Sequence, residues 1–516
     1  MQLRFQDFDD FVVFFKPNGI RMHQVDDGHF GFVEAVSQKL AAPLYIVHRL
    51  DKETSGLVLF AKNKDSASLL SELFEDHLIQ KTYFFLTDRK PDEKFYLVKS
   101  HIEKKQNRFV NTPGLPPNSE TLLEYVQPAG DFHLWKAIPK SGKPHQIRLH
   151  AESMNIPILG DPEHGGAPWF RLCLHASRLN FTLHGKSYSF ESEIPPSFKK
   201  PDPLMIRNLL DDAFFNRSEL FHLEKHDSFR LLHLEFKDLR VDIFNDHLWV
   251  YDYSANGLTH LQQTQIQNFA NDQHLHSVIR HMLDRGQGVG GLEQTTLQQS
   301  TPETTWHAFE EKIQYVLKTN SGFSPGLFLD QRENRQWIRK MALDKNVLNL
   351  FSYTSGFSVA AALGGAQQVT SVDASKKFLE WSKENFKANA LSSEKYEFFA
   401  QDCMLFLKGA QKRHRTWNLI ICDPPSFGRS QDSIWKIEKN LGELAHLIWN
   451  CLAVNGQLLF TCNYEKWTRH ELIAEFSKNL PHGKFKLDRL PLLSLDFGET
   501  DDTQNLMKGF LLTRLS

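Results

Sequence analysis

The sequence predicts a multidomain chain of α+β and α/β type, with a mixed-sheet domain, a small α/β middle domain and a doubly wound, Rossmann-like domain. Its 516 residues, 41% of them hydrophobic, suffice for about three domains with cores of their own. Up to about residue 200, short β-type runs alternate with Gly/Pro turns, whereas from about 321 strands alternate with helices. A Pro-rich, charged stretch at 193–203 suits a linker. We therefore expect domains at 1–200, 226–320 and 321–516, with a linker at 201–225.

Composition excludes several classes of protein. Lys and Arg number 60 against 62 Asp and Glu, and the pI is about 6.9, so the chain is not basic all over as DNA-coating proteins are. A local basic groove stays compatible with this balance. The five cysteines lack metal-ligand spacing and indicate reduced thiols in a cytosolic protein. We expect no metal, no signal peptide and no membrane span, and hence a cytoplasmic protein.

The first domain is expected to be mostly β. Apolar, β-branched runs predict strands, and apolar residues at helical spacing predict one helix. The predicted strands are 11–15, 45–47, 57–60, 84–86, 121–126 and 133–138, and the predicted helix is 66–77.

The same criteria divide the rest of the chain. In the middle segment they predict strands at 230–236, 248–253 and 313–317 and a helix over 264–282. His274, His276 and His281 are then interpreted as a polar helix face rather than a metal site. The last segment has predicted strands at 347–350, 369–372, 419–422 and 457–462, with a helix ending near Asn389.

One charged turn, 48–57, lies between two of the apolar runs and carries Asp51. A carboxylate in such a place is costly unless it is paired or used. Taken alone, a structural ion pair would explain it. An Arg such as Arg148 would keep the carboxylate ionised and able to attack an anomeric carbon. Arg148 is expected on a strand, because the apolar Ile147 and Leu149 alternate with polar residues around it. Glycosidases need two carboxylates for this. The absence of a second acid points to a leaving group that needs no protonation, such as a pyrimidine base.

A protein-kinase catalytic loop is excluded as an explanation of this turn. The order is His48-Arg49-Leu50-Asp51, and no Gly-rich loop precedes it.

Six motifs in one order, at 16–19, 48–56, 81–83, 141–150, 157–161 and 172–176, resemble the RluA-type RNA pseudouridine synthases over residues 1 to about 200. The resemblance implies that Asp51 detaches uracil from ribose, that Tyr83 stacks on the base and that Arg148 pairs with Asp51. It implies no cofactor for this domain. RNA contacts are implied for Arg49, Lys143, His145 and Gln146. Lys143 and Pro144 depart from the usual Arg-Thr of the family, and Lys lacks the bidentate fork of Arg.

A second centre is predicted at 349–356, where a small-residue loop follows a strand and opens a helix. Asp373 ends the next strand at the spacing of a ribose-binding acid, and Asp402 follows the third strand. The full Gly-x-Gly-x-x-Gly is missing, which counts against NAD. Asp423-Pro424-Pro425-Ser426-Phe427 at the fourth strand resembles the catalytic-loop signature of nucleic-acid methyltransferases that use S-adenosylmethionine.

From Gly326-Leu327-Phe328-Leu329-Asp330-Gln331-Arg332 to the C-terminus the chain resembles the RlmI/RlmK-type methyltransferases of 23S ribosomal RNA. The middle segment resembles the small α/β domain that precedes the methyltransferase in that family, so the two resemblances together cover about 226 to 516. The resemblance implies that the cofactor is S-adenosylmethionine. The implied cofactor-binding residues are Asn349, Phe351, Ser352, Tyr353, Gly356, Asp373, Asp402, Asp423 and Pro424, and Asp423 is also a catalytic candidate. Ser355 stands where the family usually has Gly.

The sequence leaves the methylated atom open. Methylation of cytosine at carbon 5 requires a Cys thiolate, and Cys462 at the end of the fifth strand is the candidate for it. The neighbouring Asn463, Tyr464 and Trp467 favour guanine N7 instead, and N2 is a further alternative.

We therefore expect a two-activity RNA modification enzyme that isomerises uridine to pseudouridine and methylates a base. The expected partner is RNA, 23S ribosomal RNA above all, with transfer RNA as an alternative for the first activity and no DNA. A competing hypothesis is an RNA-binding ribosome-assembly factor with one or both centres idle. Methylation of protein or DNA is disfavoured by the resemblance of the middle segment.

Overall fold

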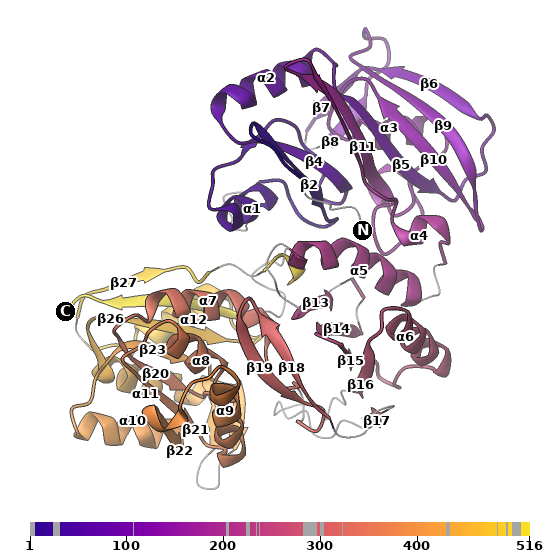
Figure 1. Ribbon diagram of the computed structural model, residues 1–516. Helices are drawn as coiled ribbons and strands as arrows, with labels where there is room; N and C mark the ends of the chain where they lie inside the picture. Colours follow the sequence, from indigo (N-terminus) through magenta and orange to yellow (C-terminus); the bar gives the residue numbers. More distant parts are fainter. Residues whose placement is uncertain are drawn as a thin grey trace. The chain divides into compact units, whose positions relative to one another are not determined.

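The computed structural model describes residues 6–23, 31–106, 108–202, 206–222, 228–233, 235–236, 238–281, 297–299, 304–321, 324–429, 434–481, 483–491, 494–497 and 507–516. The chain divides into two compact units (Figure 1). The first consists of Met1–Leu223, Leu231–Lys237 and Thr259–Gln273, and the second of Glu224–Arg230, Asp238–Leu258 and His274–Ser516.

The first unit is built on a ten-stranded mixed sheet. Its main path runs β1-β2-β4-β11-β5-β10-β9-β6, with β12 beside β11 and β3 beside β4. Only the β4–β11 pair is parallel among the described pairs of this sheet. The strands are β1 Gln6–Asp7, β2 Phe11–Lys16, β3 Tyr45–Ile46, β4 Ser55–Ala61, β5 Gln80–Thr87, β6 Phe95–Ser100, β9 Ser119–Ala129, β10 Phe132–Pro139, β11 Leu174–Leu183 and β12 Lys186–Glu191. The β-rich character predicted from the sequence is confirmed.

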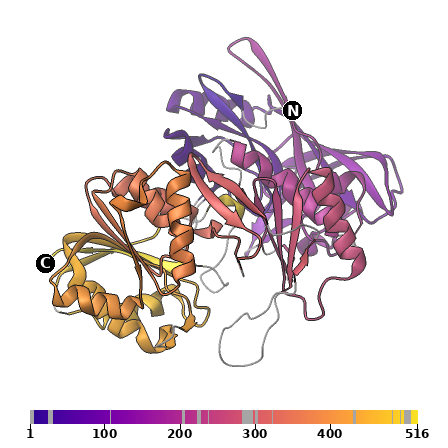
Figure 2. The ribbon, with the colours of Figure 1, turned by 60° about the horizontal axis from the view of Figure 1, so that its bottom comes forward.

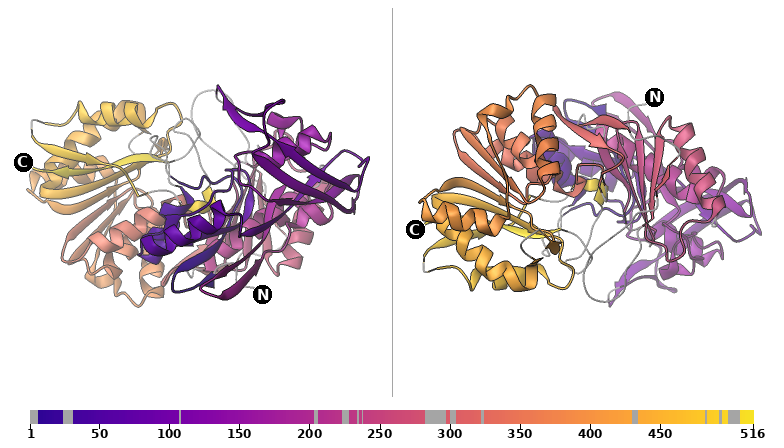
Figure 3. Two further views of the ribbon diagram at one scale, coloured as in Figure 1. Left: turned by 90° about the horizontal axis from the view of Figure 1, so that it is seen from above. Right: turned by 90° about the horizontal axis from the view of Figure 1, so that it is seen from below.

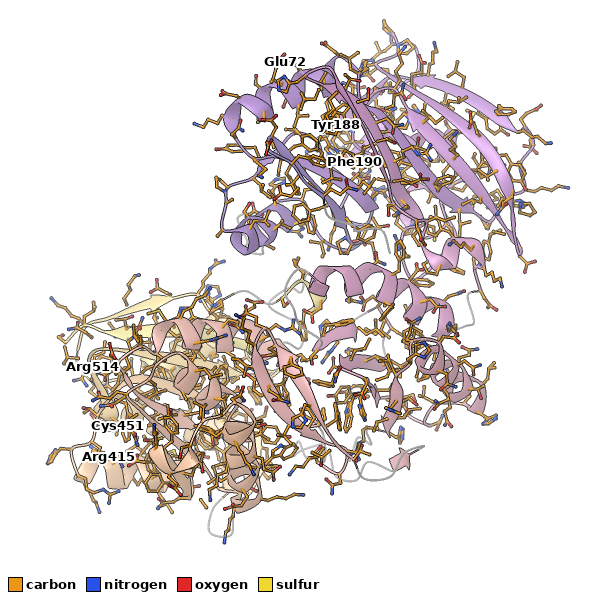
Figure 4. The ribbon with its side chains drawn as sticks, viewed as in Figure 1. Glu72, Tyr188, Phe190, Arg415, Cys451 and Arg514 are labelled. Carbon is orange, nitrogen blue, oxygen red and sulfur yellow. The ribbon has the colours of Figure 1, made fainter. Side chains whose placement is uncertain are left out.

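The core of this unit lies under helix α2, Lys64–Glu75, which falls where the helix was predicted. Leu70 of this helix is fully buried with Phe11 and Leu59 of the sheet. Strand β12 adds two aromatic rings, those of Tyr188 and Phe190, which stack against each other (Figure 4). The sheet and α2 thus form one packed layer pair that supports the segment carrying Asp51.

The stretch around Arg148 is a helix and not the predicted strand. Helix α3, Gln146–Ser153, begins after His145, whose φ is 56°. It packs on β9 and β10 and buries Ile147, Leu149 and His150. Because most positions of this short helix are buried, no polar stripe marks the helical period in the sequence, and the alternation of Ile147 and Leu149 looked like a strand.

The range predicted as a linker, 201–225, contains helix α5, Ile206–His222, after a single helical turn, α4 Pro196–Lys199. Asp212 on α5 accepts hydrogen bonds from the backbone N–H and the hydroxyl of Ser197. Helix α6, His260–Asp272, contacts α5 within the same unit. The predicted domain boundaries stay predictions, but the interval 206–222 is helical.

The predicted helix over 264–282 is wrong in its second half. Helix α6 ends at Asp272, and strand β16, His276–His281, follows. His274 lies between them with a φ of 58°, so the three histidines do not share a helix face. A five-stranded sheet has the order β13-β14-β15-β16-β17, with β13 Ser228–Leu232, β14 Leu239–Phe244, β15 His247–Asp252 and β17 Leu297–Gln299. The hairpin of β18, Thr305–Glu310, and β19, Ile313–Lys318, follows.

The second unit contains a seven-stranded sheet of order β22-β21-β20-β23-β26-β28-β27, covered by helices on both faces (Figures 2 and 3). The first five strands are parallel, and β28 runs antiparallel between β26 and β27. The strands are β20 Asn346–Leu350, β21 Gln368–Asp373, β22 Glu397–Ala400, β23 Trp417–Cys422, β26 Leu452–Cys462, β27 Phe485–Asp488 and β28 Lys508–Arg514. The predicted doubly wound architecture is confirmed.

Alternate residues of each strand supply two separate cores. Val347, Leu419 and Leu459 pack with helices α7 Arg332–Met341, α8 Gly356–Leu363 and α9 Lys376–Ala388. Leu348 and Ile420 pack on the other side with α10 Cys403–Lys412, α11 Ile437–Cys451 and α12 Arg469–Ser477. This two-residue period is the reason that the strands read as continuous apolar runs. Among the described residues, no helix is long and apolar enough to cross a membrane.

Candidate active sites

The segment 48–55 is held in place by its neighbours on both sides. Gly56 has a φ of 123°, and a Cβ there would lie 2.2 Å from the carbonyl oxygen of Ala176 on the parallel strand β11. No other residue fits this close approach. The fully buried Lys16 donates from Nζ to the carbonyl oxygen of Lys52 at 2.9 Å, and Gly19 N–H donates to the same oxygen. The Lys16–Gly19 turn therefore fixes the backbone beside Asp51.

Arg148 lies between the predicted nucleophile and two further acids. Its Nη1 is 3.8 Å from Oδ2 of Asp51, while Nε and Nη2 bind the two oxygens of Asp161 at 2.7 and 2.6 Å. Nη2 also donates to Glu163 at 2.9 Å. The bidentate pair with the fully buried Asp161 carboxylate orients the guanidinium. The remaining nitrogen, Nη1, then faces Asp51. Asp161 is thus a further residue of the site, and it lies in the motif 157–161, which by itself does not indicate that Asp161 binds Arg148.

Tyr83 lies on β5, opposite Ala176 of β11 and Ala137 of β10. It is buried, and both burial and the nearby Asp51 charge raise the pKa of its phenol well above the usual range. The ring therefore stays neutral. The structure thus brings Asp51, Tyr83 and Arg148 together from three separate segments.

The residues predicted to contact RNA fall into two groups. Arg49 and Lys143 are exposed and His145 is half-buried, with Nδ1 3.1 Å from Nε2 of His164. Gln146 is buried and fully engaged. Its Oε1 accepts from Ser141 Oγ and Lys143 N–H, and its Nε2 donates to Glu120 O and Thr121 Oγ1. This placement favours a role of Gln146 in ordering the loop over the predicted RNA contact.

The second unit has a cavity of about 380 Å³ at the carboxyl ends of its parallel strands. It opens where the strand order reverses between β20 and β23, the place at which doubly wound sheets bind ligands. Eight of the nine residues predicted to bind the cofactor line this cavity: Phe351, Ser352, Tyr353, Gly356, Asp373, Asp402, Asp423 and Pro424. The ninth, Asn349, donates to Ser358 Oγ at 2.9 Å and is buried in β20.

The loop after β20 is strained. Phe351, Tyr353 and Ser355 have φ values of 54°, 48° and 60°, a conformation that side chains with a Cβ rarely adopt. Tyr353 N–H donates to Asp373 Oδ2 at 2.9 Å, which joins the ends of β20 and β21. Burial raises the pKa of Asp373, whereas this N–H and that of Ser375 lower it. The second oxygen of Asp373 accepts from Ser375, and Asp402 caps helix α10.

Asp423 lies on the wall of the cavity and is held by two hydrogen bonds. Thr461 Oγ1 donates to its Oδ1 at 2.7 Å, and Gln331 Nε2 donates to its Oδ2 at 3.0 Å. Burial raises the pKa of this carboxyl to about 6. The same wall contains Asp330 and Arg335. Asp330 and Gln331 belong to the stretch 326–332, which carries the resemblance to the RlmI/RlmK-type family, and Arg335 follows it. No role in binding was predicted for these three residues, because they precede the loop of β20 by about twenty residues.

Cys462 ends β26, as predicted, but its thiol is buried. Burial first, and then the Asp423 charge, raises the pKa of the thiol to about 12. Asn463, the next residue, lines the cavity. The geometry therefore favours the neutral thiol, whereas a covalent route needs a thiolate.

The residues of the cavity fit S-adenosylmethionine. Asp373 ends the second strand of the sheet and lines the cavity, as a ribose-binding acid does. Ser352 Oγ is buried at the cavity wall without a hydrogen-bond partner among the described residues, which a polar ligand would supply.

Comparison with known proteins identifies two families along the chain. Residues 10–153 match the family model described as RNA pseudouridylate synthase, and residues 244–507 match that described as S-adenosylmethionine-dependent methyltransferase. "Ribosomal RNA large subunit methyltransferase K/L" of Shewanella frigidimarina is 38% identical over 160 residues, 31% of this chain and 22% of the relative. The protein of the same name from Shewanella sp. strain ANA-3 is 30% identical over 310 residues, 56% of this chain and 42% of the relative. The chain thus spans between a fifth and a half of the length of these curated relatives.

A solved structure extends the likeness. The crystal structure of SMU.776, described as a methyltransferase complexed with SAH, has a TM-score of 0.52 at 26% identity. The match covers 65% of this chain and 87% of that one. Since the methyltransferase model alone covers residues 244–507, the chain belongs to the family of S-adenosylmethionine-dependent methyltransferases, with an RNA pseudouridylate synthase domain preceding that region.

Proposed function

We propose that this chain is a bifunctional RNA modification enzyme, which converts uridine to pseudouridine in its first unit and methylates an RNA base in its second. The observation that carries the proposal is the completeness of each centre within its own unit. Asp51, Tyr83 and Arg148 meet in the first, and the cavity with Asp373 and Asp423 belongs to the second. An assembly factor with idle centres would have no need of both sets.

In the first unit, the chemistry follows from one carboxylate, that of Asp51. Arg148 lies 3.8 Å from this carboxylate and orients it, and Asp51 attacks the anomeric carbon of the ribose while the uracil leaves with the electrons of the broken glycosidic bond. The detached base rotates and rejoins ribose through carbon 5, which breaks the bond to Asp51 and releases its carboxylate. The hydrogen on carbon 5 is then lost as a proton, and N1 of the base gains a proton. Tyr83 packs against the base. The target nucleotide must leave its stack to reach this buried ring. We propose that this step needs no cofactor or metal.

In the second unit, S-adenosylmethionine supplies an electrophilic methyl group. Asp373 would hold the ribose hydroxyls, and the loop 351–356 the methionine end. Asp423 would accept a hydrogen bond from an N–H of the target base and orient it. Because the Cys462 thiol is buried and neutral, we propose transfer to a base nitrogen without an enzyme–base adduct.

We propose 23S ribosomal RNA as the substrate and the cytoplasm as the site of action. The curated relatives are named as methyltransferases of the large-subunit ribosomal RNA. Transfer RNA is a second candidate for the first activity only. Exposed Arg49 and Lys143 beside the first centre suit a phosphate backbone.

The purified full chain tests both activities at once. Large-subunit ribosomal RNA from cells lacking the gene would be labelled with tritium at uridine carbon 5 and incubated with S-adenosylmethionine carrying a ¹⁴C methyl group. We expect release of tritium from carbon 5 and incorporation of ¹⁴C into RNA. Methylcytosine carrying the label at carbon 5 would contradict the nitrogen assignment, and neither signal would contradict the proposal as a whole.

A further inference from the structure

A closed group of hydrogen bonds surrounds the Asp423 carboxylate. Gln331 ends the short 3-10 turn Leu329–Gln331, and its Nε2 donates both to Asp423 Oδ2 at 3.0 Å and to Thr461 Oγ1 at 3.2 Å. Thr461 in turn donates to Asp423 Oδ1 at 2.7 Å. Both oxygens of the carboxylate are therefore fixed, and the cycle leaves Asp423 one orientation in the cavity wall.

The orientation of the Gln331 amide is itself determined. Asn334, one turn later on α7, donates from Nδ2 to Gln331 Oε1 at 2.7 Å. An amide whose oxygen already accepts must direct its nitrogen to the other side, here towards Asp423. Gln331 and Asn334 are 4% and 1% exposed, so water does not compete for these bonds. The Asn334 Nδ2 also lies 3.3 Å from Sδ of Met507, which lines the cavity.

We propose that Gln331 is a positioning residue for methyl transfer, because it holds the Asp423 carboxylate ionised and aimed at the N–H of the target base. The inference rests on the function proposed above. Gln331 acts through Asp423, and the neutral amide supplies the N–H without bringing a charge. Asn334 fixes the amide for this task.

The charges around Asp423 make this contribution necessary. Asp330 raises its pKa and Arg335 lowers it, and the buried thiols of Cys422 and Cys462 are the other titratable groups nearby. Arg335 is engaged by the Glu310 carboxylate, with Nε 2.8 Å from Oε2. N–H donors to a carboxylate favour its charged form. Loss of the Gln331 donor should therefore raise the pKa of Asp423 and move the acidic limb of methyl transfer to higher pH.

The test is the pH profile of methyl transfer by the full chain, with ribosomal RNA from cells lacking the gene. In Gln331→Met, which keeps the volume but loses the amide, we expect the acidic limb of kcat to move up by about one pH unit. The maximal kcat should fall about tenfold or more, while KM for S-adenosylmethionine changes less than threefold. Gln457→Met is the matched control, since Gln457 hydrogen-bonds Lys345, which precedes β20 at the edge of the sheet opposite the cavity.

Asn334→Leu keeps the proposal testable if Gln331→Met does not fold. In this variant we expect the acidic limb of the pH profile of kcat to move to higher pH by less than in Gln331→Met. A folded Gln331→Met with the wild-type pH profile would overturn the proposal, as would a loss confined to KM for S-adenosylmethionine. Absence of methyl transfer by the wild type would instead remove the proposed function itself.

Discussion

Ser355 has a left-handed backbone conformation at the start of helix α8. The family that this region resembles usually has Gly at the same position. Such a conformation costs a residue with a Cβ about 1 kcal/mol. Ser355→Gly should therefore stabilise the second unit by about 0.5–1 kcal/mol, as measured by thermal unfolding. Asn455→Gly is the control, since Asn455 has a φ of 62° at an exposed position near the start of β26 and Asn tolerates this region of backbone conformation.

Ser355→Gly also removes the Ser355 hydroxyl, so the affinity of the variant for S-adenosylmethionine is a second measurement. Its Oγ is buried without a hydrogen-bond partner among the described residues. We expect the affinity for S-adenosylmethionine to stay within about threefold of the wild type, as titration calorimetry would measure. A tenfold loss of affinity would contradict a purely conformational role and assign the hydroxyl to the cofactor.

His48 predicts the response of the first unit to acid. Its Nε2 accepts from Leu59 N–H at 2.8 Å, and burial lowers its pKa from 6.5 to about 3. The unfolded chain then binds more protons than the folded one between pH 6.5 and 3, so stability falls as the pH falls through this window. The loss should reach about 2 kcal/mol at pH 5. Amide hydrogen exchange of β4 measures it, and His48→Gln should flatten the dependence. An unchanged slope in that variant would contradict the assignment.

Cys462→Ala separates the two routes to a methylated base. The thiol is 1% exposed, and its pKa is raised to about 12, so it supplies almost no thiolate at neutral pH. We expect methyl transfer by Cys462→Ala to stay within about threefold of the wild type. Loss of transfer by a folded variant, with trapping of RNA by the wild type on a 5-fluorocytosine substrate, would restore the carbon-5 route.

At the scale of elements, helix α5 belongs to the first unit through a buried pair. Arg171 Nη1 is 3.3 Å from Asp212 Oδ2 on α5, and Arg171 Nη2 donates to Ser55 Oγ at 2.5 Å, four residues after Asp51. Removing one partner of such a pair leaves an uncompensated buried charge. Asp212→Ala should therefore destabilise the first unit by about 3–5 kcal/mol and lower pseudouridine formation. Thermal unfolding and tritium release would measure both.

The exposed pair of Arg178 and Glu191 provides the control for that variant. Glu191→Ala should change stability by less than about 1 kcal/mol. Equal effects of Asp212→Ala and Glu191→Ala would show that α5 does not support the first unit.

Sequence patterns predicted the elements whose periods were clean. The strands of the last domain and helix α2 lie where apolar runs or helical spacing indicated. The predictions for two segments were wrong, those for helix α3 and for the residues after the end of α6, and the reasons differ. Helix α3 is too buried to display a polar stripe, and the histidines after Asp272 prolong a polar pattern across a helix end and into β16. Local periodicity does not record which neighbours cover a segment.

The candidate sites were predictable as far as they carry motifs. Asp51, Asp373 and Asp423 stand in recognisable surroundings, and the structure places each at its expected centre. Asp161 and Gln331 act by orienting other side chains, Arg148 and Asp423. These contacts depend on tertiary proximity over 13 and 92 residues. A sequence motif can therefore contain such a residue without indicating which side chain it orients.

For the whole molecule, the net charge of −2 means that RNA affinity has to come from local basic surfaces. The salt dependence of RNA binding should then be real but modest. Filter binding between about 50 and 300 mM salt would measure the slope. A slope near zero would contradict direct binding of the RNA backbone.

The central claim is that one chain performs two independent base modifications, and one measurement tests it directly. Nucleoside mass spectrometry would be applied to ribosomal RNA from cells lacking the gene, complemented with the wild type, Asp51→Asn or Asp423→Asn. We predict that Asp51→Asn restores the methyl mark but not the pseudouridine, and that Asp423→Asn does the reverse. Full restoration of pseudouridine by Asp51→Asn would contradict the claim that one chain performs two independent modifications. The same holds if RNA from the deletion strain still carries both modifications.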